Sequence, residues 1–330
     1  MPAPPQAQDS LRGNEPSHAA SVHHVYLSPH ADDVAFSCLG QITQQRRACQ
    51  QPIQQTVVTV FLSSPSPRRS EDEKAARLLG CEYRCLELPD APDRPEVRGA
   101  LDLFMRFGPP HLGITNEVVS RLLAWLPASA TLHAPLAVGG HIDHRIAHEA
   151  ARALAYQVGP TLRLAYYEDL PYAQADHALT RRLAALGVQQ GIRASAAQER
   201  AAYRRWLLSM PHMQGRLHGW RQLAAHMAAA AAVQADDDLG HRRPGFPPHL
   251  HAQLVDVTEH IEKRADVIAA YASQWPLFAE SPKALAARFF AYGHALAPAS
   301  ARATACYERI WFDDGVYGPQ AGPAPSHTPA

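Results

Sequence analysis

Two short segments concentrate side chains that can bind a metal ion and move protons. The first is Ser28-Pro29-His30-Ala31-Asp32-Asp33, and the second is His141-Ile142-Asp143-His144. A hydrolytic zinc ion takes three nitrogen or oxygen ligands from the protein and leaves a fourth position for water. His30 and Asp33 are three positions apart, where a loop meets a predicted helix, so both can point to one ion. Together with His144 they form a His/Asp/His ligand set, which predicts one zinc ion per chain.

Three further residues of these segments are suited to proton transfer beside such an ion. Asp32 lies next to the ion without binding it, and a free carboxylate there can accept the proton of an activated water. His141 can protonate a departing amine or, as a protonated imidazole, stabilise an oxyanion. Asp143 can orient and charge His141. The pattern therefore predicts Asp32, His141 and Asp143 as catalytic residues of a metal-dependent hydrolase.

Each segment also has a plainer interpretation when it is taken alone. Consecutive acids such as Asp32 and Asp33 are common where a helix begins, because carboxylates favour the positive end of the helix dipole. An isolated His-x-Asp-His at a helix start is an equally weak signal. The two segments are more specific together, because both follow predicted strands of one α/β pattern.

Other candidate residues are less specific. His148 lies four positions after His144 and is an alternative ligand, although Arg145 stands where His-x-x-x-His proteases place a glutamate. Cys81 and Cys85 have no second Cys or His pair nearby, so buried thiols are expected rather than a second metal. Glu168 and Asp169 follow a predicted strand and are candidates for binding sugar hydroxyls, with helix capping as the alternative. The histidines that alternate along the first strand, His23 and His24, are interpreted as structural.

Short apolar or β-branched runs alternate with helical patterns over the first half of the chain. Because parallel strands need crossover connections, this alternation predicts a Rossmann-like three-layer α/β/α fold with a mostly parallel sheet. Ligands of such sheets bind where the strand order reverses, commonly between the first and fourth strands. That placement would bring the two segments together. The predicted strands are 22–27, 56–62, 83–88, 131–134 and 162–167, and the predicted helices are 34–50, 71–79, 114–126 and 144–156.

The pattern changes after Pro171 to Ala- and Arg-rich helical stretches, which predict a helical C-terminal extension. We expect helices at 177–186, 195–208, 217–234, 259–273 and 282–295, a loop at 236–249 and a strand at 253–257. Residues 22–316 are interpreted as a single domain, with a catalytic α/β part at 22–175 and a helix-rich part at 176–316. The Pro-, Gly- and Ala-rich ends, 1–21 and 317–330, are predicted to be disordered.

Composition limits the classes of partner and compartment. The chain of 330 residues has 31 Lys and Arg against 31 Asp and Glu, which disfavours nucleic acid or an anionic membrane as a partner. No run of about 18 apolar residues predicts a membrane span, and no apolar stretch near the start predicts a signal peptide. An odd number of cysteines, 5, without a paired framework favours free thiols and a cytoplasmic location.

At the two motifs the sequence resembles the PIG-L/LmbE-like zinc-dependent N-acetylglucosaminyl deacetylases. Their first motif, (A/S)-H-P-D-D-E after a strand, is matched by residues 28–34, and their H-x-D-H motif is matched by residues 141–144. The resemblance spans most of residues 22–175 and implies the ligand and catalytic roles given above. Ala31 and Val34 depart from the family's Pro and Glu, which weakens inferences about the substrate. Arg69 resembles an arginine that reaches substrate in the family, with a solvated arginine as the alternative.

The sequence thus predicts a hydrolase that removes the acetyl group from an N-acetylated amino sugar, of the N-acetylglucosamine type, or from its conjugate. Its expected partner is this small-molecule sugar, with a homo-oligomer left open. One alternative is a metal-dependent phosphoesterase, which would normally use two metal ions about 4 Å apart and therefore more ligands. Another is a carbohydrate-binding protein that retains the metal without turnover, which would have no use for a base at Asp32.

Overall fold

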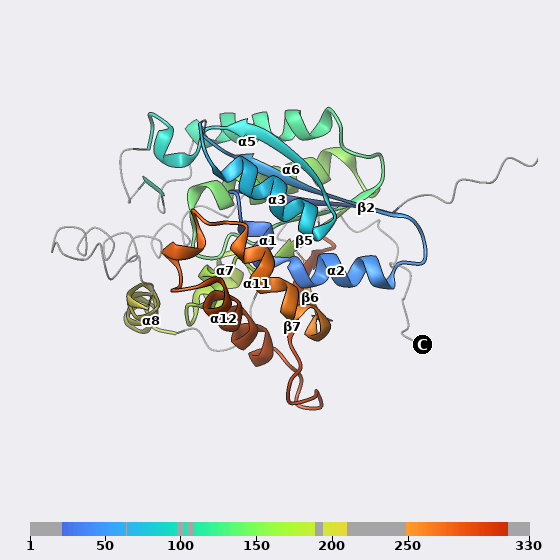
Figure 1. Cartoon of the computed structure of the whole chain (residues 1–330). Helices are drawn as coiled ribbons and strands as arrows, with labels where there is room; N and C mark the ends of the chain where they lie inside the picture. The colour runs from blue at the N-terminus through green and yellow to red at the C-terminus, as the bar shows by residue number, and fades with distance from the viewer. Residues whose placement is uncertain are drawn as a thin grey trace, which may run out of the picture.

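The computed structural model describes residues 22–63, 65–97, 102–103, 109–188, 194–209 and 249–315. Strands from both halves of the chain form one sheet (Figure 1). These strands are β1 (Val22–Ser28), β2 (Ile53–Phe61), β3 (Glu82–Leu88), β4 (Ala130–Pro135), β5 (Leu162–Tyr167), β6 (Leu250–Asp256) and β7 (Tyr307–Asp313).

The strand order in this seven-stranded sheet is β3-β2-β1-β4-β5-β7-β6. Strands β1 to β5 pair in parallel, whereas β7 is antiparallel to both β5 and β6. The chain leaves β1 towards β2 on one side, and β4 lies on the other side of β1. The mostly parallel sheet is confirmed, and its order reverses between β1 and β4, as the sequence predicted.

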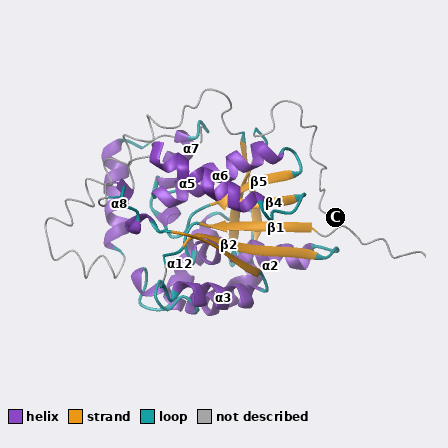
Figure 2. Ribbon diagram, turned by 90° about the horizontal axis from the view of Figure 1, so that it is seen from above, coloured by secondary structure: helices purple, strands orange, loops and turns teal. Residues whose placement is uncertain are grey.

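Helices cover both faces of the sheet (Figure 2). Helices α5 and α6 pack against each other, and α6 contacts β4 and β5, while α2, α3 and α12 lie on the opposite side of the sheet in Figure 2. The longer described helices are α2 (Leu39–Ala48), α3 (Arg68–Leu79), α5 (Pro109–Leu123), α6 (Ile142–Val158), α7 (Ala178–Ala185), α8 (Ala196–Leu208), α11 (Ile261–Ala269) and α12 (Pro282–Ala295). Shorter ones are α1 (Asp33–Ser37), η1 (Ala91–Asp93), η2 (Tyr172–Gln174), η3 (Thr258–His260) and η4 (Trp275–Leu277).

The burial of the central strands follows from their apolar sequence. Strand β2 ends in the run TVVTVF, and every residue of that run is buried, as expected for a parallel strand covered on both faces. Helix α6 places Ile142, Ile146, Ala150 and Leu154 on one buried stripe, because residues four apart share a helix face. This stripe fixes α6 on the sheet with its first turn at the carboxyl end of β4.

The C-terminal part contains one strand more than the expected helical extension with its single strand. Strand β6 agrees with the predicted strand at 253–257, but β7 was not predicted. Only part of β7 alternates, between buried and half-buried residues, so a search for regular strand patterns overlooks it. Because β7 pairs with β5, the two halves of the chain share one sheet. The predicted helix at 217–234, nearly all of the loop at 236–249 and both predicted disordered tails lie outside the described residues.

Candidate metal centre and catalytic site

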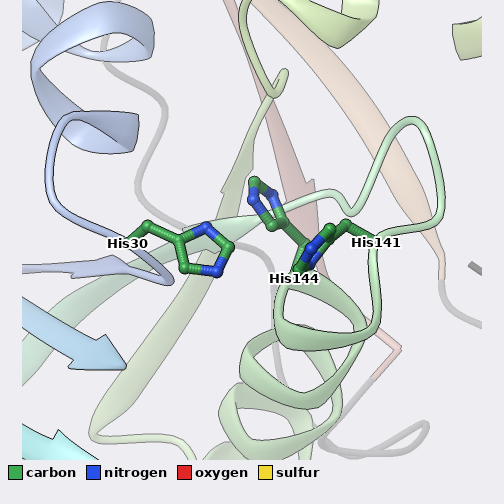
Figure 3. Close-up of side chains that lie close together, drawn as sticks. All are labelled: His30, His141 and His144. Carbon is green, nitrogen blue, oxygen red and sulfur yellow. The ribbon is translucent and has the colours of Figure 1, made fainter. Parts of the chain in front are cut away.

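Neighbouring strands bring the two polar segments together. Strand β1 ends at Ser28 and β4 at Pro135, and the two strands pair in parallel. The loop after β1 carries His30, and the loop after β4 leads to His141 and the first turn of α6. Figure 3 shows these side chains facing His144. The ring centroid of His30 lies 5.0 Å from that of His141 and 5.2 Å from that of His144.

The carboxylate of Asp33 lies between two of these imidazoles. Its Oδ2 is 3.5 Å from His30 Nδ1 and 3.4 Å from His144 Nε2. Within the described residues, His30, His141 and His144 also form the one group of three metal-binding types whose donor atoms lie within 4.8 Å of one another. The structure therefore brings four candidate ligands to one point, of which a zinc ion with an open position needs three.

Carboxylates behind two of the imidazoles decide which ring nitrogens face this point. His30 Nε2 lies 2.9 Å from Asp143 Oδ2, and His144 Nδ1 lies 2.6 Å from Asp169 Oδ1. A carboxylate accepts a hydrogen bond from the ring N–H beside it, so the other nitrogen of each neutral ring keeps its lone pair for a metal ion. His144 Nε2 is buried and has no hydrogen-bond partner. The donor set fits zinc, and this buried nitrogen is one that a cation would satisfy.

His141 is held in the opposite way. Its Nδ1 accepts a hydrogen bond from the backbone N–H of Asp143, 3.2 Å away, and so caps the N-terminus of α6. A ring nitrogen that accepts a hydrogen bond carries no hydrogen of its own. The single ring proton of neutral His141 is therefore on Nε2. Burial, and next the neighbouring His30, lower the pKa of His141 to about 3. His141 is therefore arranged as an Nε2–H donor, and the three ligands that the geometry favours are His30, Asp33 and His144.

Electrostatics at this point favour positive charge. Burial alone would lower the pKa of His30, but hydrogen bonds with Asp143 and Asp33 raise it well above its usual value. Burial would raise the pKa of Asp33, but His144 and His30 hold it below its usual range. The carboxylates thus stabilise a cation between the two loops.

Asp32 is buried in an unusual backbone conformation beside the ligands. Its φ of 99° is in the left-handed region, which a residue with a side chain adopts only when its surroundings impose it. Asp72 of α3 holds the backbone of Asp32 through a hydrogen bond, and Thr59 and Tyr271 donate to Asp72 at 2.5 and 2.8 Å. Burial and the nearby Asp33 raise the pKa of Asp32 well above its usual value, which suits a group that accepts a proton.

The structure corrects the role expected for Asp143. Its carboxylate lies 2.9 Å from His30 Nε2, accepts the backbone N–H of Ala91 at 3.0 Å, and forms an ion pair with Arg94 at 2.7 Å. The backbone N–H of Asp143, rather than its side chain, orients His141. The side chain points back under the first loop because α6 begins at Ile142, so Asp143 is a positioning residue for a ligand.

A cavity of about 220 Å³ opens beside these residues. Arg68 and Asp90, which form an ion pair at 3.3 Å, lie on one wall. Gln274 and Phe278, from the C-terminal part, lie on another. Arg69, the arginine expected to reach substrate, does not line the cavity. It is exposed and pairs with Glu87, because residues one apart on α3 face different directions.

The two acidic residues expected to bind sugar hydroxyls are occupied within the protein. Glu168 accepts hydrogen bonds from Tyr292, Arg309 and Trp311. Asp169 accepts the backbone N–H of Val138 at 2.8 Å and pairs with His144. Glu168 therefore joins β5 to β7, and Asp169 orients a candidate ligand. Neither lines the cavity.

The remaining candidates lie outside the cluster. His148 Nδ1 contacts the carbonyl of Pro135, and its ring stacks on Tyr166, so this ring is not one of the grouped donors. Cys81 and Cys85 are free thiols, as expected, but they are half-buried rather than buried. His24 Nδ1 lies 3.0 Å from Nε2 of His133, within the sheet and away from the site.

Comparison with known proteins finds deacetylases that are similar in sequence or in fold. No family model matches the chain. A 2'-N-acetylparomamine deacetylase from Streptomyces fradiae is 38% identical over 168 residues, which cover 44% of this chain and 56% of that protein. The match thus spans about half the length of that relative.

Two solved deacetylase structures share the fold. The zinc-inhibited form of a teicoplanin deacetylase superposes with a TM-score of 0.55 at 18% identity, covering 88% of this chain and 97% of the other. An A40926 pseudoaglycone deacetylase does so with a TM-score of 0.51 at 19% identity, covering 87% and 95%. At these identities the likeness shows the fold. Together with the sequence relative, it confirms the resemblance to LmbE-like deacetylases.

Sequence reasoning missed three residues of the site. From the sequence, Arg69 was chosen instead of Arg68. The two are neighbours on α3, and only the face of the helix on which each lies decides which one reaches the cavity. Asp72 carries no local signal, because its partners Thr59 and Tyr271 are remote in sequence. Gln274 reaches the cavity from a 3-10 turn in the C-terminal part. Long-range packing, rather than spacing, defines these three positions.

Proposed function

We propose that the protein is a zinc-dependent N-deacetylase that removes the acetyl group from an N-acetylated amino sugar or its conjugate. One observation carries this proposal. His30 and His144 each contact a carboxylate through one ring nitrogen and turn the other nitrogen towards Asp33. Asp32 lies beside this group and is left for proton transfer. His30, Asp33 and His144 would hold the ion. Zinc bound there would supply Lewis acidity, polarising the acetamide carbonyl and increasing the acidity of water.

The other residues have complementary tasks. Asp32 takes a proton from the attacking water, because its buried carboxylate lines the cavity next to the proposed ligands without being one of them. His141 Nε2–H donates a hydrogen bond to the oxygen that becomes negative in the transition state. From the sequence, a protonated His141 was expected to stabilise this oxygen. A neutral ring is proposed here instead, because Nδ1 accepts the backbone N–H of Asp143 and so carries no proton. The protonated Asp32 is then the group placed to return a proton to the departing amine.

The substrate class is supported by the sequence relative, which is described as acting on 2'-N-acetylparomamine. The cavity of about 220 Å³ matches a group smaller than a whole conjugate, so the acetamide-bearing ring would enter it. A two-metal phosphoesterase would need a second set of ligands, and the described residues contain one grouped set.

The organisation of the chain is part of the proposal. We treat residues 22–316 as one domain, supported by the pairing of β7 with β5. No described helix is long and apolar enough to cross a membrane. The odd number of cysteines, 5, favours free thiols and a reducing compartment, so we propose a cytoplasmic location. A homo-oligomer is compatible with this proposal.

The test combines acetate release with metal content. The zinc-loaded protein is incubated with N-acetylglucosamine, its β-linked oligosaccharides and N-acetylated aminoglycoside pseudodisaccharides, and acetate is measured beside zinc per chain. We expect acetate from at least one sugar, about one zinc per chain, and loss of activity on chelation with recovery on adding zinc. Phosphate release from phosphate esters with two metal ions per chain would instead support the phosphoesterase, and binding without acetate release a non-catalytic protein.

A further inference from the structure

A buried ion pair lies behind the proposed metal ligands. Asp143 Oδ1 is 2.7 Å from Arg94 Nη1, and the two side chains are 0% and 2% exposed. Arg94 follows η1, in the loop after β3. It is not among the residues that line the catalytic cavity. Any part that Arg94 plays in the reaction therefore passes through Asp143.

The two carboxylate oxygens of Asp143 have separate partners. Oδ2 lies 2.9 Å from His30 Nε2 and accepts the backbone N–H of Ala91 at 3.0 Å, whereas Oδ1 faces the guanidinium of Arg94. A carboxylate turns as one plane about its Cβ–Cγ bond, so a contact that fixes Oδ1 also fixes Oδ2. The backbone N–H of Arg94 donates to the carbonyl of Ala91 at 3.2 Å. One turn of the chain thus supplies both contacts that hold Asp143 against His30.

Stability alone does not explain a buried arginine at this position. The cost of removing two charges from water commonly cancels the attraction within a buried ion pair. Arg94 Nη2 is also buried without a hydrogen-bond acceptor, which adds to the cost. The rest of the guanidinium lies 5.3 Å from the ring centroid of Phe61 and, through Nε, 3.4 Å from Glu96. An apolar side chain would fill this space at a lower cost, so the contact with Asp143 is the reason that we seek in the site.

The carboxylate behind the other imidazole ligand is held in the same way. Asp169 Oδ1 lies 2.6 Å from His144 Nδ1, and Asp169 Oδ2 accepts the backbone N–H of Val138 at 2.8 Å. In both cases a group from another element fixes the oxygen that faces away from the imidazole. At Asp143 that group is charged, because the guanidinium of Arg94 stands where Asp169 has a backbone N–H.

We infer that Arg94 is a positioning residue for the proposed metal centre, because it holds the Asp143 carboxylate where Oδ2 meets His30 Nε2. Held in this way, His30 keeps its Nδ1 on the side of Asp33, whose Oδ2 is 3.5 Å away. The inference rests on the proposed function for the ion itself. It extends that function by making metal affinity depend on a residue that contacts neither the ion nor the substrate.

Removal of Arg94 has two effects on metal affinity, and they have opposite signs. Arg94→Met takes a positive charge away from the neighbourhood of a divalent cation, and by electrostatics alone this strengthens metal binding. The same substitution releases the Asp143 carboxylate. This weakens metal binding, because the carboxylates behind metal-binding histidines contribute about 10- to 100-fold in affinity. The sign of the change therefore distinguishes a positioning role from an effect of charge.

The affinity test is a double-mutant cycle. Zinc affinity is measured without substrate, by competition with a fluorescent chelator, in Arg94→Met, Asp143→Asn and the double variant. We expect Arg94→Met to bind zinc about 10-fold more weakly than the parent and to cause no further loss in Asp143→Asn. Arg47→Met, which removes an exposed ion pair with Glu259 at 2.9 Å, is the control and should keep the parent affinity. Unchanged or stronger binding in Arg94→Met, or equal losses in both backgrounds, would overturn the inference.

Arg94→Lys covers the case in which Arg94→Met does not fold, since it keeps the charge opposite Asp143 but not the guanidinium plane. We expect its zinc affinity to lie between those of the parent and Asp143→Asn, and the NMR signal of His30 Nε2–H in the isotope-labelled, zinc-loaded protein to shift. Parent affinity or a stationary His30 signal would contradict the positioning role. Because no substrate is present, absence of acetate release would refute the deacetylase and leave this inference standing, whereas a parent protein that binds no zinc would refute both.

Discussion

His141 and His144 lie one helical turn apart, yet their Nδ1 atoms have opposite hydrogen-bonding environments, which suit the different roles that we propose for them. The Nδ1 atom of His141 meets a backbone N–H, whereas that of His144 meets the carboxylate of Asp169. One ring therefore presents a proton to the cavity and the other presents a lone pair. The motif alone predicted two useful histidines, and the atoms behind each ring separate donor from ligand.

Asp32 is expected to act on protons and not on metal binding. Asp32→Asn keeps the shape of the side chain but removes its basicity, so turnover should fall roughly 10²- to 10⁴-fold. Zinc per chain, measured by atomic emission, should stay at the parent level. Asp266→Asn, at an exposed carboxylate on α11, should change neither quantity. Near-normal turnover in Asp32→Asn would refute its assignment as the base.

Asp169 is expected to act through His144. Asp169→Asn removes the charge that holds the proton on His144 Nδ1, so zinc affinity should fall about 10- to 100-fold. Competition with a fluorescent chelator measures this affinity, and circular dichroism checks the fold. Added zinc should restore turnover towards the parent value. Unchanged affinity would show that Asp169 does not position the ligand.

At the scale of elements, the parallel part of the sheet was predictable and the antiparallel part was not. The runs of β1, β2 and β5 are apolar and bounded by turns, so their places follow from pattern. Strand β7 is held by contacts with remote residues, which its own sequence pattern does not predict. The main example is Glu308, which accepts the backbone N–H groups of Gly40 and Gln41 at 2.9 and 2.7 Å. Such remote pairings also explain why Arg68 and Gln274 could not be assigned from spacing.

The contact between α12 and β7 depends on one glycine. A Cβ at Gly293 would lie 2.5 Å from Cys306 Sγ and 2.6 Å from the backbone oxygen of Tyr307. Gly293→Ala should therefore destabilise the protein by about 1–3 kcal/mol, as overpacked positions do. Gly113→Ala on α5 meets no atom within 4 Å and should stabilise by about 0.5–1 kcal/mol. Urea unfolding measures both, and equal effects would contradict this close approach.

At the scale of the whole molecule, the stability should depend on pH through a buried histidine pair. Burial, with Arg163 and His23 nearby, lowers the pKa of His24 to about 4, and burial also lowers the pKa of His133. The unfolded chain therefore binds more protons than the folded chain between about pH 6.5 and 4, so stability is present above pH 6.5 and is lost as the pH falls.

The substitution His133→Phe tests this dependence. It keeps the stacking on Tyr26, where the ring centroids are 4.4 Å apart, but removes one titrating group. The free energy of unfolding is measured in urea from pH 4.5 to 7. Its slope against pH should be smaller than in the parent, by the amount that corresponds to about one proton taken up on unfolding. His251→Gln, at an exposed histidine of β6, is the control. An unchanged slope in His133→Phe would exclude this pair as the source.

Metal binding should also be visible in the stability of the whole molecule. An ion that binds the folded chain stabilises it by about 2.7 kcal/mol at 100 times its dissociation constant. Chelation should therefore lower the melting temperature of the parent, and zinc should restore it. His144→Gln should show no zinc-dependent shift, whereas His148→Gln should keep one. The reverse pattern would make His148 the ligand.

The candidate site draws on both halves of the chain, which has a consequence for synthesis on the ribosome. The residues proposed to hold zinc have all been made by residue 144, but the cavity wall at Gln274 and the Glu308 support for the helices after β1 come much later. A growing chain can thus acquire its metal before it can enclose a substrate. If the proposed ligands hold zinc, metal uptake should need the chain as far as Asp169, which orients His144, whereas substrate turnover should need it as far as β7.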